Sequence, residues 1–311
     1  MMGIYGFSNF RNRSQLFLTT FIIALSYAVC YIALNIIIEG GFSEIDWLSI
    51  GYLGISALLT LLAYPLIYAF EKVFSFISDV TLLELADTNN KLLRELSRKA
   101  PGTFQHSLQV ANLAETATSI IGGNTLLIRT AALYHDIGKM EAPMYFIENQ
   151  STGLNPHDEL SYEESAQIII NHVTKGIEIA KKNGVPDKII DFIRTHHGTT
   201  KTGYFFKMYM KENPDENEQD VVDMFTYPGP IPFSKESAAL MMADSVEAAS
   251  RSLKEPNVES IEKLVESIIT NQIKEGQFEN ADITLRDIRL IKKMFKKMLM
   301  NIYHVRIEYP H

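Results

Sequence analysis

The hydrophobic positions of this 311-residue chain form two kinds of pattern. In the first seventy residues they form continuous runs without a formal charge, about 22 residues from Phe17 to Ile38 and about 23 from Leu48 to Phe70. Beyond residue 100 they recur every three or four positions among polar residues, which is typical of amphipathic helices. No segment alternates with the two-residue period of a half-buried strand. The pattern predicts an all-α protein, with an N-terminal transmembrane hairpin followed by a helical body.

The two uncharged runs are each long enough to cross a bilayer, which needs about 20 helical residues. A buried core helix or a cleaved signal peptide would explain one such run, but two in tandem favour membrane spans at about 17–38 and 48–70. Arg11, Arg13 and Lys72 flank the hairpin, whereas its short connection is acidic. Because basic flanks stay on the cytosolic side, we expect a multi-pass protein of the cell inner membrane whose body is cytosolic.

Three regions follow from this division: a transmembrane hairpin over 1–70, a linker helix over 71–99 and a helical domain over 100–311. Leucines recur among charged residues in the linker, which fits either a helix packed on the domain or a signalling or dimerising stalk. In the domain we expect helices at about 103–121, 124–136, 161–183, 186–197, 234–253, 257–274 and 284–303. Residues 199–232 are expected to be irregular, with a solvated acidic loop from Glu212 to Asp223.

Five of the eight histidines and two aspartates in this domain lie at expected helix ends or inside apolar helical stretches. Neutral imidazoles and carboxylates are the ligands that Mn and Fe accept. More than four such groups favour two ions that share a carboxylate, an arrangement that hydrolyses phosphate esters. The candidate metal ligands are His106, His135, Asp136, His172, His196, His197 and Asp244.

Charge and cysteine content restrict the alternatives. The formal net charge of −8 argues against a nucleic-acid polymer as partner, because such binders usually carry a basic patch. A small anionic substrate remains compatible, since bound cations reverse the sign of charge within a cleft. The single cysteine, Cys30, lies in an apolar run and excludes an intrachain disulfide.

Several strings resemble one known family. HDIGK at 135–139, HHGTT at 196–200, ADSVEAASRS at 243–252 and His106-Ser107 are similar to the HD-domain phosphohydrolase superfamily. APGTFQHS at 100–107, YFIENQ at 145–150, NPHDELS at 155–161 and YPGP at 227–230 narrow the resemblance to PgpH-type (7TM-HD) membrane-anchored cyclic-di-AMP phosphodiesterases. The resemblance covers about residues 50–308. It implies an all-α HD domain with a dinuclear Mn or Fe site that opens c-di-AMP to linear pApA.

The resemblance also implies roles for individual residues. It assigns His106, His135, Asp136 and Asp244 to one ion, and His172, His196 and His197 to a second ion, with Asp136 bridging. Lys139, one turn beyond Asp136, is expected to place a further cation on the phosphate. The remaining candidates are substrate contacts, namely Tyr145, Glu148, Asn149, Gln150, Tyr204 and Arg251. His157 is expected to be structural, and His304 and His311 are expected to lie away from the site.

Two features of the sequence concern the extent of the chain and the choice of its substrate. Members of the family carry a large extracellular domain and about seven spans, whereas two spans are predicted here, so the chain is either a shortened relative or a fragment. The Gly-Tyr-Pro signature of related cyclic-di-GMP enzymes is absent after His196-His197.

The expected function is hydrolysis of c-di-AMP in second-messenger turnover. The alternatives are hydrolysis of another nucleotide such as c-di-GMP, or a non-catalytic receptor for nucleotides. The expected partners are the dinucleotide, the lipid bilayer and a second copy in a homodimer.

Overall fold

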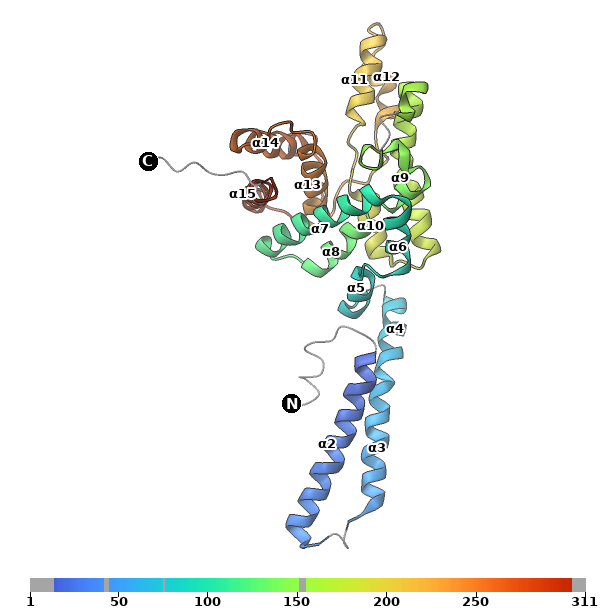
Figure 1. Ribbon diagram of the computed structural model, residues 1–311, viewed down its shortest axis with the longest axis vertical. Helices are drawn as coiled ribbons and strands as arrows, with labels where there is room; N and C mark the ends of the chain where they lie inside the picture. The colour runs from blue at the N-terminus through green and yellow to red at the C-terminus, as the bar shows by residue number, and fades with distance from the viewer. Residues whose placement is uncertain (1–13, 42–44, 75, 151–154, 304–311) are drawn as a thin grey trace, which may run out of the picture. The chain divides into compact units, whose positions relative to one another are not determined.

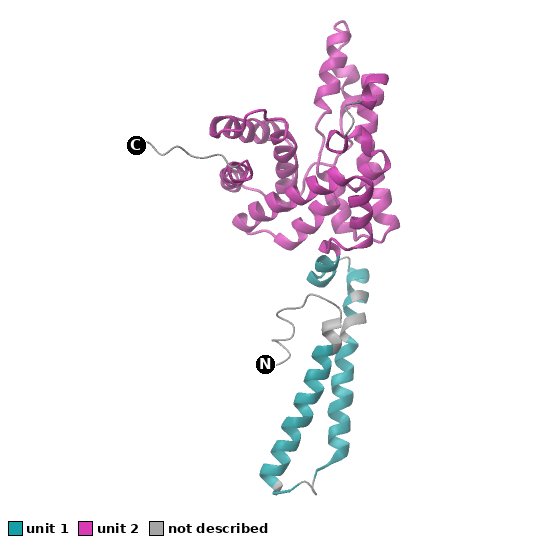
Figure 2. Ribbon diagram, in the orientation of Figure 1, with its two compact units in different colours: residues 1–84 teal, residues 85–311 magenta. Residues whose placement is uncertain are grey.

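The computed structural model describes residues 14–41, 45–74, 76–150 and 155–303 of the chain. These residues form helices and one isolated β-bridge between Lys201 and Thr226, so the all-α prediction is confirmed for them. The chain divides into two units, residues 1–84 and residues 85–311, which Figure 2 colours separately. The first unit carries both apolar runs, and the second carries every candidate metal ligand.

Two apolar helices dominate the first unit. Helix α2 spans Ser14–Glu39 and α3 spans Trp47–Leu61, and the two helices lie side by side (Figure 1). Asp46 starts α3 by accepting a hydrogen bond from the backbone amide of Leu48 at 3.0 Å. Large apolar side chains are exposed along both helices, and Ile37 reaches 78% exposure. Exposed apolar surface of this extent marks a region that contacts lipid or another protein.

Among the described residues, α2 is the one helix whose length and hydropathy are sufficient to cross a membrane, from Leu18 to Ile38. The second predicted span differs from the prediction, because α3 and α4 (Ala63–Phe74) divide it. Leu62 lies between them, and its amide donates to the carbonyl of Leu59. Pro65 has no amide hydrogen to donate to the preceding turn, which weakens helical continuity at this junction.

The segment 71–99 is not the single linker helix that we predicted. Helix α5 spans Asp79–Ala86 and α6 spans Lys91–Lys99. Between them the Asp87 carboxylate accepts the amide of Asn89. Asn90 then caps α6 by accepting the amide of Leu92. Short polar side chains that bind nearby amides compete with helix continuation, so the sequence Asp-Thr-Asn-Asn separates two helices.

Of the two interpretations of the linker, α6 fits a packing helix. Leu92, Leu93 and Leu96 are buried, and α6 contacts α7. Helix α6 also belongs to the unit that begins at Leu85 rather than to the unit with the apolar runs.

Four helices of the second unit begin at the residues where the sequence predicts a start, and each of these starts is a capping box. Ser161, Ser234, Asn257 and Thr284 each accept the amide of the residue three positions later in a capping box. The α-helices from α7 onward span Pro101–Ile121 (α7), Thr125–Tyr134 (α8), Tyr162–Lys182 (α9), Asp187–Thr195 (α10), Gly203–Glu212 (α11), Glu218–Val221 (α12), Lys235–Ser250 (α13), Val258–Lys274 (α14) and Leu285–Ile302 (α15). Short 3-10 helices lie between these α-helices, at Ile137–Glu141 (η2), Pro143–Tyr145 (η3), Ile147–Asn149 (η4), Pro156–Glu159 (η5) and Val222–Phe225 (η6).

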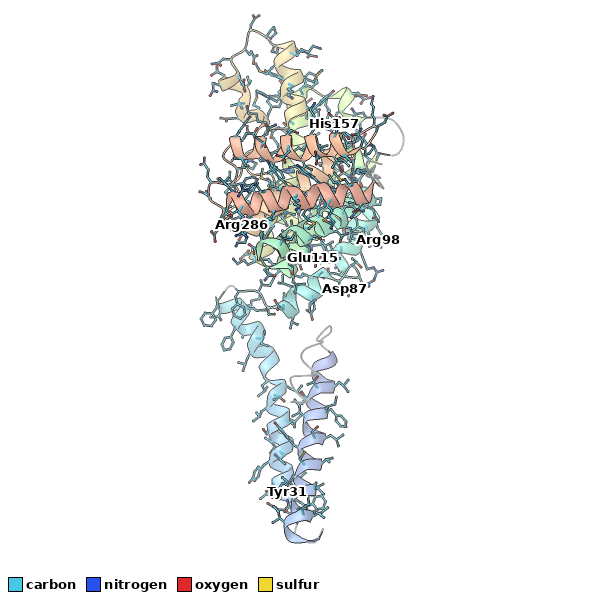
Figure 3. The ribbon with its side chains drawn as sticks, turned by 90° about the vertical axis from the view of Figure 1, so that its left-hand side faces the viewer. Tyr31, Asp87, Arg98, Glu115, His157 and Arg286 are labelled. Carbon is cyan, nitrogen blue, oxygen red and sulfur yellow. The ribbon has the colours of Figure 1, made fainter. Side chains whose placement is uncertain are left out.

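Helix α7 lies at the centre of this unit and contacts α6, α8, α13 and α15. Its buried face carries small side chains, including Ala111, Ala114 and Ala117, which allow these neighbours to approach closely. Helices α14 and α15 lie side by side on the outside, and Arg286 marks the start of α15 in Figure 3. The central position of α7 brings His106 into the interior of the unit, where it is 3% exposed.

The prediction of an irregular stretch over 199–232 was wrong in its middle. Helix α11 occupies 203–212, and Tyr209 packs with Phe225 in a cluster that includes Ala166 of α9. The apolar residues Phe206, Tyr209 and Met210 recur at helical spacing, which is a signal that sequence analysis could have used. The acidic part also contains α12 and η6 rather than a loop alone.

Gly138 sets the distance between η2 and α9. A Cβ atom at this position would lie 1.8 Å from the carbonyl oxygen of His172 and 2.5 Å from the amide nitrogen of Gly176. The absence of a side chain therefore allows η2, which directly follows Asp136, to contact the turn of α9 that carries His172. Backbone contact at this point fixes the separation of two candidate metal ligands.

We expect Gly138→Ala to lower the free energy of unfolding by about 2 kcal/mol or more, because the added methyl group must separate η2 from α9. Thermal unfolding of the full chain in detergent, followed by circular dichroism, measures this change. Gly203→Ala is the matched control, since a Cβ atom there meets nothing within 4 Å. Equal unfolding temperatures for the two variants would contradict the close-contact interpretation.

Candidate metal centre

The seven candidate ligands come from five places along the helical chain and converge in the second unit. Each lies where a helix passes or ends at the centre of the domain. His135 is the C-cap of α8 and Asp136 the N-cap of η2, so one short turn directs both side chains inward. The others lie within α7 (His106), within α9 (His172), directly after α10 (His196 and His197) and within α13 (Asp244).

The first ligand set contains His106, His135, Asp136 and Asp244, whose donor atoms all lie within 4.8 Å of one another. Nε2 of His106 lies 2.9 Å from Oδ1 of Asp244 and 3.5 Å from Oδ2 of Asp136. Nε2 of His135 lies 3.2 Å from the same Asp136 oxygen. All four residues are buried. Two imidazoles and two carboxylates thus face one small volume.

The second ligand set contains His172, His196, His197 and again Asp136. Oδ1 of Asp136, the oxygen that faces away from the first set, lies 3.3 Å from Nε2 of His172 and 3.6 Å from Nε2 of His196. The His172 and His196 Nε2 atoms are 3.2 Å apart. Each carboxylate oxygen of Asp136 therefore serves a different set, as a bridging ligand would.

The orientation of the imidazoles favours coordination through Nε2. In His135 and His196 the other ring nitrogen, Nδ1, donates to the backbone carbonyl three residues earlier, at 2.7 Å to Ala132 and 2.8 Å to Ile193. Nδ1 of His172 makes the same contact with the carbonyl of Ile169. Hydrogen bonds of this kind fix the tautomer of a ligand histidine and leave Nε2 free for a metal ion.

The donor set fits divalent ions. Nε2 of His135 and Oδ1 of Asp136 are buried and have no hydrogen-bond partner among the described residues. A buried polar atom without a partner costs free energy, so such atoms in a folded protein need a ligand, water or ion. Imidazole and carboxylate donors suit borderline first-row ions. We infer that these atoms are available for metal coordination.

The positive and negative side chains of the two ligand sets stabilise one another's charges. Burial alone would raise the pKa of Asp136, but the positive charges of His135 and Lys139 outweigh it and hold that pKa well below its ordinary value. Burial likewise opposes ionisation of Asp244, but the hydrogen bond from His106 helps to hold its pKa well below the ordinary range. Both carboxylates are therefore ionised at neutral pH, which is the state a metal ligand requires.

The imidazoles differ in their proton affinity. Burial opposes a charge on His135, but the nearby Asp136 and Asp244 carboxylates outweigh it and raise the pKa of His135 to about 10. Burial and the adjacent His196 ring instead hold the pKa of His197 well below its ordinary value. The first ligand set therefore carries a proton at neutral pH, whereas His197 is neutral.

Lys139 lies at the edge of the centre. Its ammonium group is 2.7 Å from Oδ2 of Asp136 and 3.0 Å from Oε1 of Glu148, and it lies 4.9 Å above the ring of Phe146. The side chain is 12% exposed. Lys139 thus lies beside a candidate metal ligand, and its role as a cation on the phosphate stays a prediction. Phe146, which sequence analysis did not select, also contacts the His172 ring edge-on with centroids 5.7 Å apart.

A cavity of about 1120 Å³ opens beside this edge. Four of the predicted substrate contacts line it, namely Tyr145, Glu148, Gln150 and Tyr204. His157 also lines the cavity, where its Nε2 bonds to the carbonyl oxygen of Tyr145 at 2.9 Å, and Figure 3 labels its position. Aromatic and amide groups in a concave site are suited to a planar polar ligand.

Two predicted substrate contacts have other partners. Asn149 exchanges hydrogen bonds with Thr103, at 3.1 Å to its backbone amide and 2.8 Å to its hydroxyl. Arg251 binds Oε1 of Glu247. Glu247, which was not among the predicted site residues, lies three residues after Asp244 and therefore on the same helical face. His304 and His311 lie outside the described residues.

The fold and the site define a class of protein: an all-helical domain with two largely buried His and Asp ligand sets that share one carboxylate. Residues 103–249 match the family described as HD domain, and residues 1–78 match the family described as 7TM receptor with intracellular HD hydrolase. The second match and the apolar helix α2 together indicate association with a membrane.

Similar proteins show which family within this class the chain belongs to. The chain is 40% identical over 306 residues to the cyclic-di-AMP phosphodiesterase PgpH of Listeria monocytogenes and 38% identical over 310 residues to that of Bacillus subtilis. These matches cover 97% and 99% of the chain but 42% and 43% of the relatives. A crystal structure of the L. monocytogenes PgpH HD domain in complex with cyclic-di-AMP matches with a TM-score of 0.67 and 44% identity, covering 70% of this chain and 100% of that chain. The chain therefore belongs to the PgpH-type (7TM-HD) family of HD-domain proteins, as its motifs predicted.

We expect metal binding to release protons from the first ligand set. His135 holds a proton below its pKa of about 10, and a coordinating imidazole must be neutral, so metal affinity should fall as the pH falls below that value. The apparent affinity should change about tenfold per pH unit for each proton released. Calorimetric titration of the full chain with Mn²⁺, in buffers of different ionisation enthalpy, measures the number released. A heat of binding that is the same in every buffer would refute proton release.

Proposed function

We propose that this protein is a metal-dependent phosphodiesterase that hydrolyses c-di-AMP to pApA at a dinuclear centre. The observation that carries the proposal is the sharing of Asp136 by two ligand sets beside a cavity with aromatic and amide groups. The 44% identity with an HD domain that was crystallised with cyclic-di-AMP supports the choice of substrate.

The seven ligands would hold two divalent ions, and we propose Mn or Fe because imidazole and carboxylate donors suit both. When bound, such ions supply an activated water and stabilise negative charge on the phosphate. In the reaction a water oxygen bonds to one phosphorus and the P–O3′ bond breaks. The proton lost by the water is balanced by a proton gained by the 3′-oxygen, so that the linear product carries a 5′-phosphate.

Lys139 would stabilise the transition state directly. Its ammonium group lies between two carboxylates, 2.7 Å from Asp136 and 3.0 Å from Glu148, so both its position and its charge are fixed before substrate binds. A preorganised cation at a site that excludes water stabilises developing charge without reorganisation. Glu148 is in turn held by the Thr103 hydroxyl at 3.1 Å. Glu148 would therefore position Lys139 beside the phosphate.

The cavity would bind a nucleobase of the dinucleotide. Tyr204 is 68% exposed and its ring lies 5.3 Å from that of Phe205, which forms an aromatic wall. Gln150 adds an amide group and Tyr145 a third aromatic ring. Stacking on such rings is worth about 1–3 kcal/mol per base.

For the first unit we propose that the two apolar segments cross the cell inner membrane with both ends in the cytosol. The residues that flank the hairpin are basic, whereas its connection is acidic, which favours this orientation. The catalytic domain would then act on a cytosolic second messenger. The homodimer expected from the linker stays a prediction.

The full chain in detergent should release pApA from c-di-AMP when Mn²⁺ or Fe²⁺ is supplied. Asp136→Ala should reduce the rate by at least about 10²-fold, because both ligand sets lose their shared carboxylate. Asp282→Ala, at an exposed position, is the matched control and should keep full activity. Preferential hydrolysis of a guanine dinucleotide would overturn the adenine assignment, and binding without turnover under either metal would favour the receptor alternative.

Tyr204→Ala should raise KM for c-di-AMP about 10-fold and leave kcat within about threefold, because a stacked base contributes similar binding energy to ground and transition states. Steady-state kinetics of the full chain measure both constants. Leu285→Ala removes a side chain of 73% exposure outside the cavity and serves as control. An unchanged KM in Tyr204→Ala would exclude the cavity as the base site.

A further inference from the structure

The ligand histidines differ in the groups that orient them. His135, His172 and His196 each present Nδ1 to a backbone carbonyl three residues earlier in the chain. His106 instead presents Nδ1 to a carboxylate, and Oε2 of Glu247 lies 2.5 Å away. Glu247 belongs to α13, 141 residues further along the chain. Among the described ligand histidines, His106 is therefore the one whose Nδ1 lies within hydrogen-bond distance of a carboxylate.

The Glu247 carboxylate is held at both oxygens. Oε2 contacts His106, and Oε1 accepts hydrogen bonds from Nε and Nη2 of Arg251 at 2.9 and 2.6 Å. Glu247 is 5% exposed, whereas the Arg251 side chain is 36% exposed. The arginine fixes the carboxylate, but its own charge is partly screened by solvent because it reaches the surface. The negative charge of Glu247 thus acts mainly on the His106 side.

The two halves of the centre consequently differ in charge. The first contains the carboxylates of Asp136 and Asp244 and has Glu247 behind His106, and these three negative charges exceed the one positive charge of Lys139, which lies 2.7 Å from Oδ2 of Asp136. The second contains three imidazoles and shares only the Asp136 carboxylate. A buried negative charge attracts a divalent cation strongly because the surroundings screen it poorly. A carboxylate behind an imidazole also raises the basicity of that ligand.

We infer that Glu247 is a positioning residue that makes the half containing His106 the tighter of the two metal sites, so that this half fills first. The inference rests on the dinuclear centre of the proposed function and adds an order of loading to it. At limiting metal the protein holds one ion, and occupancy of the half containing His172 then determines the active fraction.

Titration of the metal-free full chain with Mn²⁺, by calorimetry and by electron paramagnetic resonance, tests this order without any substrate. The wild-type chain should bind in two steps, and one equivalent should give the spectrum of isolated ions rather than coupled pairs. Glu247→Gln keeps the shape of the side chain and removes its charge. It should weaken the tighter step about 10- to 100-fold and change the second step less than about threefold.

A pair of histidine variants tests the same order when Glu247→Gln fails to fold. His172→Ala should keep the tighter step, whereas His106→Ala should lose it. Glu266→Gln is the control for removal of a carboxylate, because Glu266 pairs with Lys292 and Lys296 on the surface. Loss of the tighter step in His172→Ala, or equal weakening of both steps in Glu247→Gln, would overturn the inference. Two ordered metal steps without hydrolysis of c-di-AMP would instead refute only the proposed function.

Discussion

The site depends on the buried carboxylate of Asp136 and on the positive charges that surround it. It is 1% exposed, and each of its two oxygens faces a different group of imidazoles. An ionised carboxylate in such surroundings is stable only where opposite charge compensates for lost hydration. His135 and Lys139 provide that charge within the protein, and two divalent ions would provide more. The helices are consequently arranged around one buried anion.

Backbone packing delivers the other ligands to this anion. Gly138 and Gly176 allow η2 to touch α9, which brings His172 within 3.3 Å of Asp136. The imidazoles of His135, His172 and His196 are each oriented by the carbonyl three residues earlier, a contact that each helix provides from its own backbone. Local helical geometry thus fixes three ligands, while His106 depends on a side chain from a distant helix.

This difference explains what could be predicted from the sequence. The seven candidate ligands were recognisable because histidines and aspartates at helix ends or in apolar stretches are chemically distinctive, and because the motifs resemble a known family. Glu247 was not, because a glutamate on a helix usually faces solvent and its partner His106 is distant in the chain. Asn149 was assigned to substrate because sequence cannot show its hydrogen bonds to Thr103. Long-range polar pairs, unlike helical periodicity, leave no local pattern.

The charge of the centre would link metal loading to binding of the proposed substrate. Four carboxylates (Asp136, Asp244, Glu247, Glu148) and two cationic side chains (Lys139, Arg251) surround it, which gives a formal charge of about −2 when the histidines are neutral, as ligands must be. Two divalent ions would reverse this charge to about +2. A cyclic dinucleotide carries two phosphate charges, and the chain as a whole is acidic. The metal-free centre, whose negative charge is reduced by the proton on His135, would not attract the proposed substrate, whereas the loaded centre would complement its two negative charges.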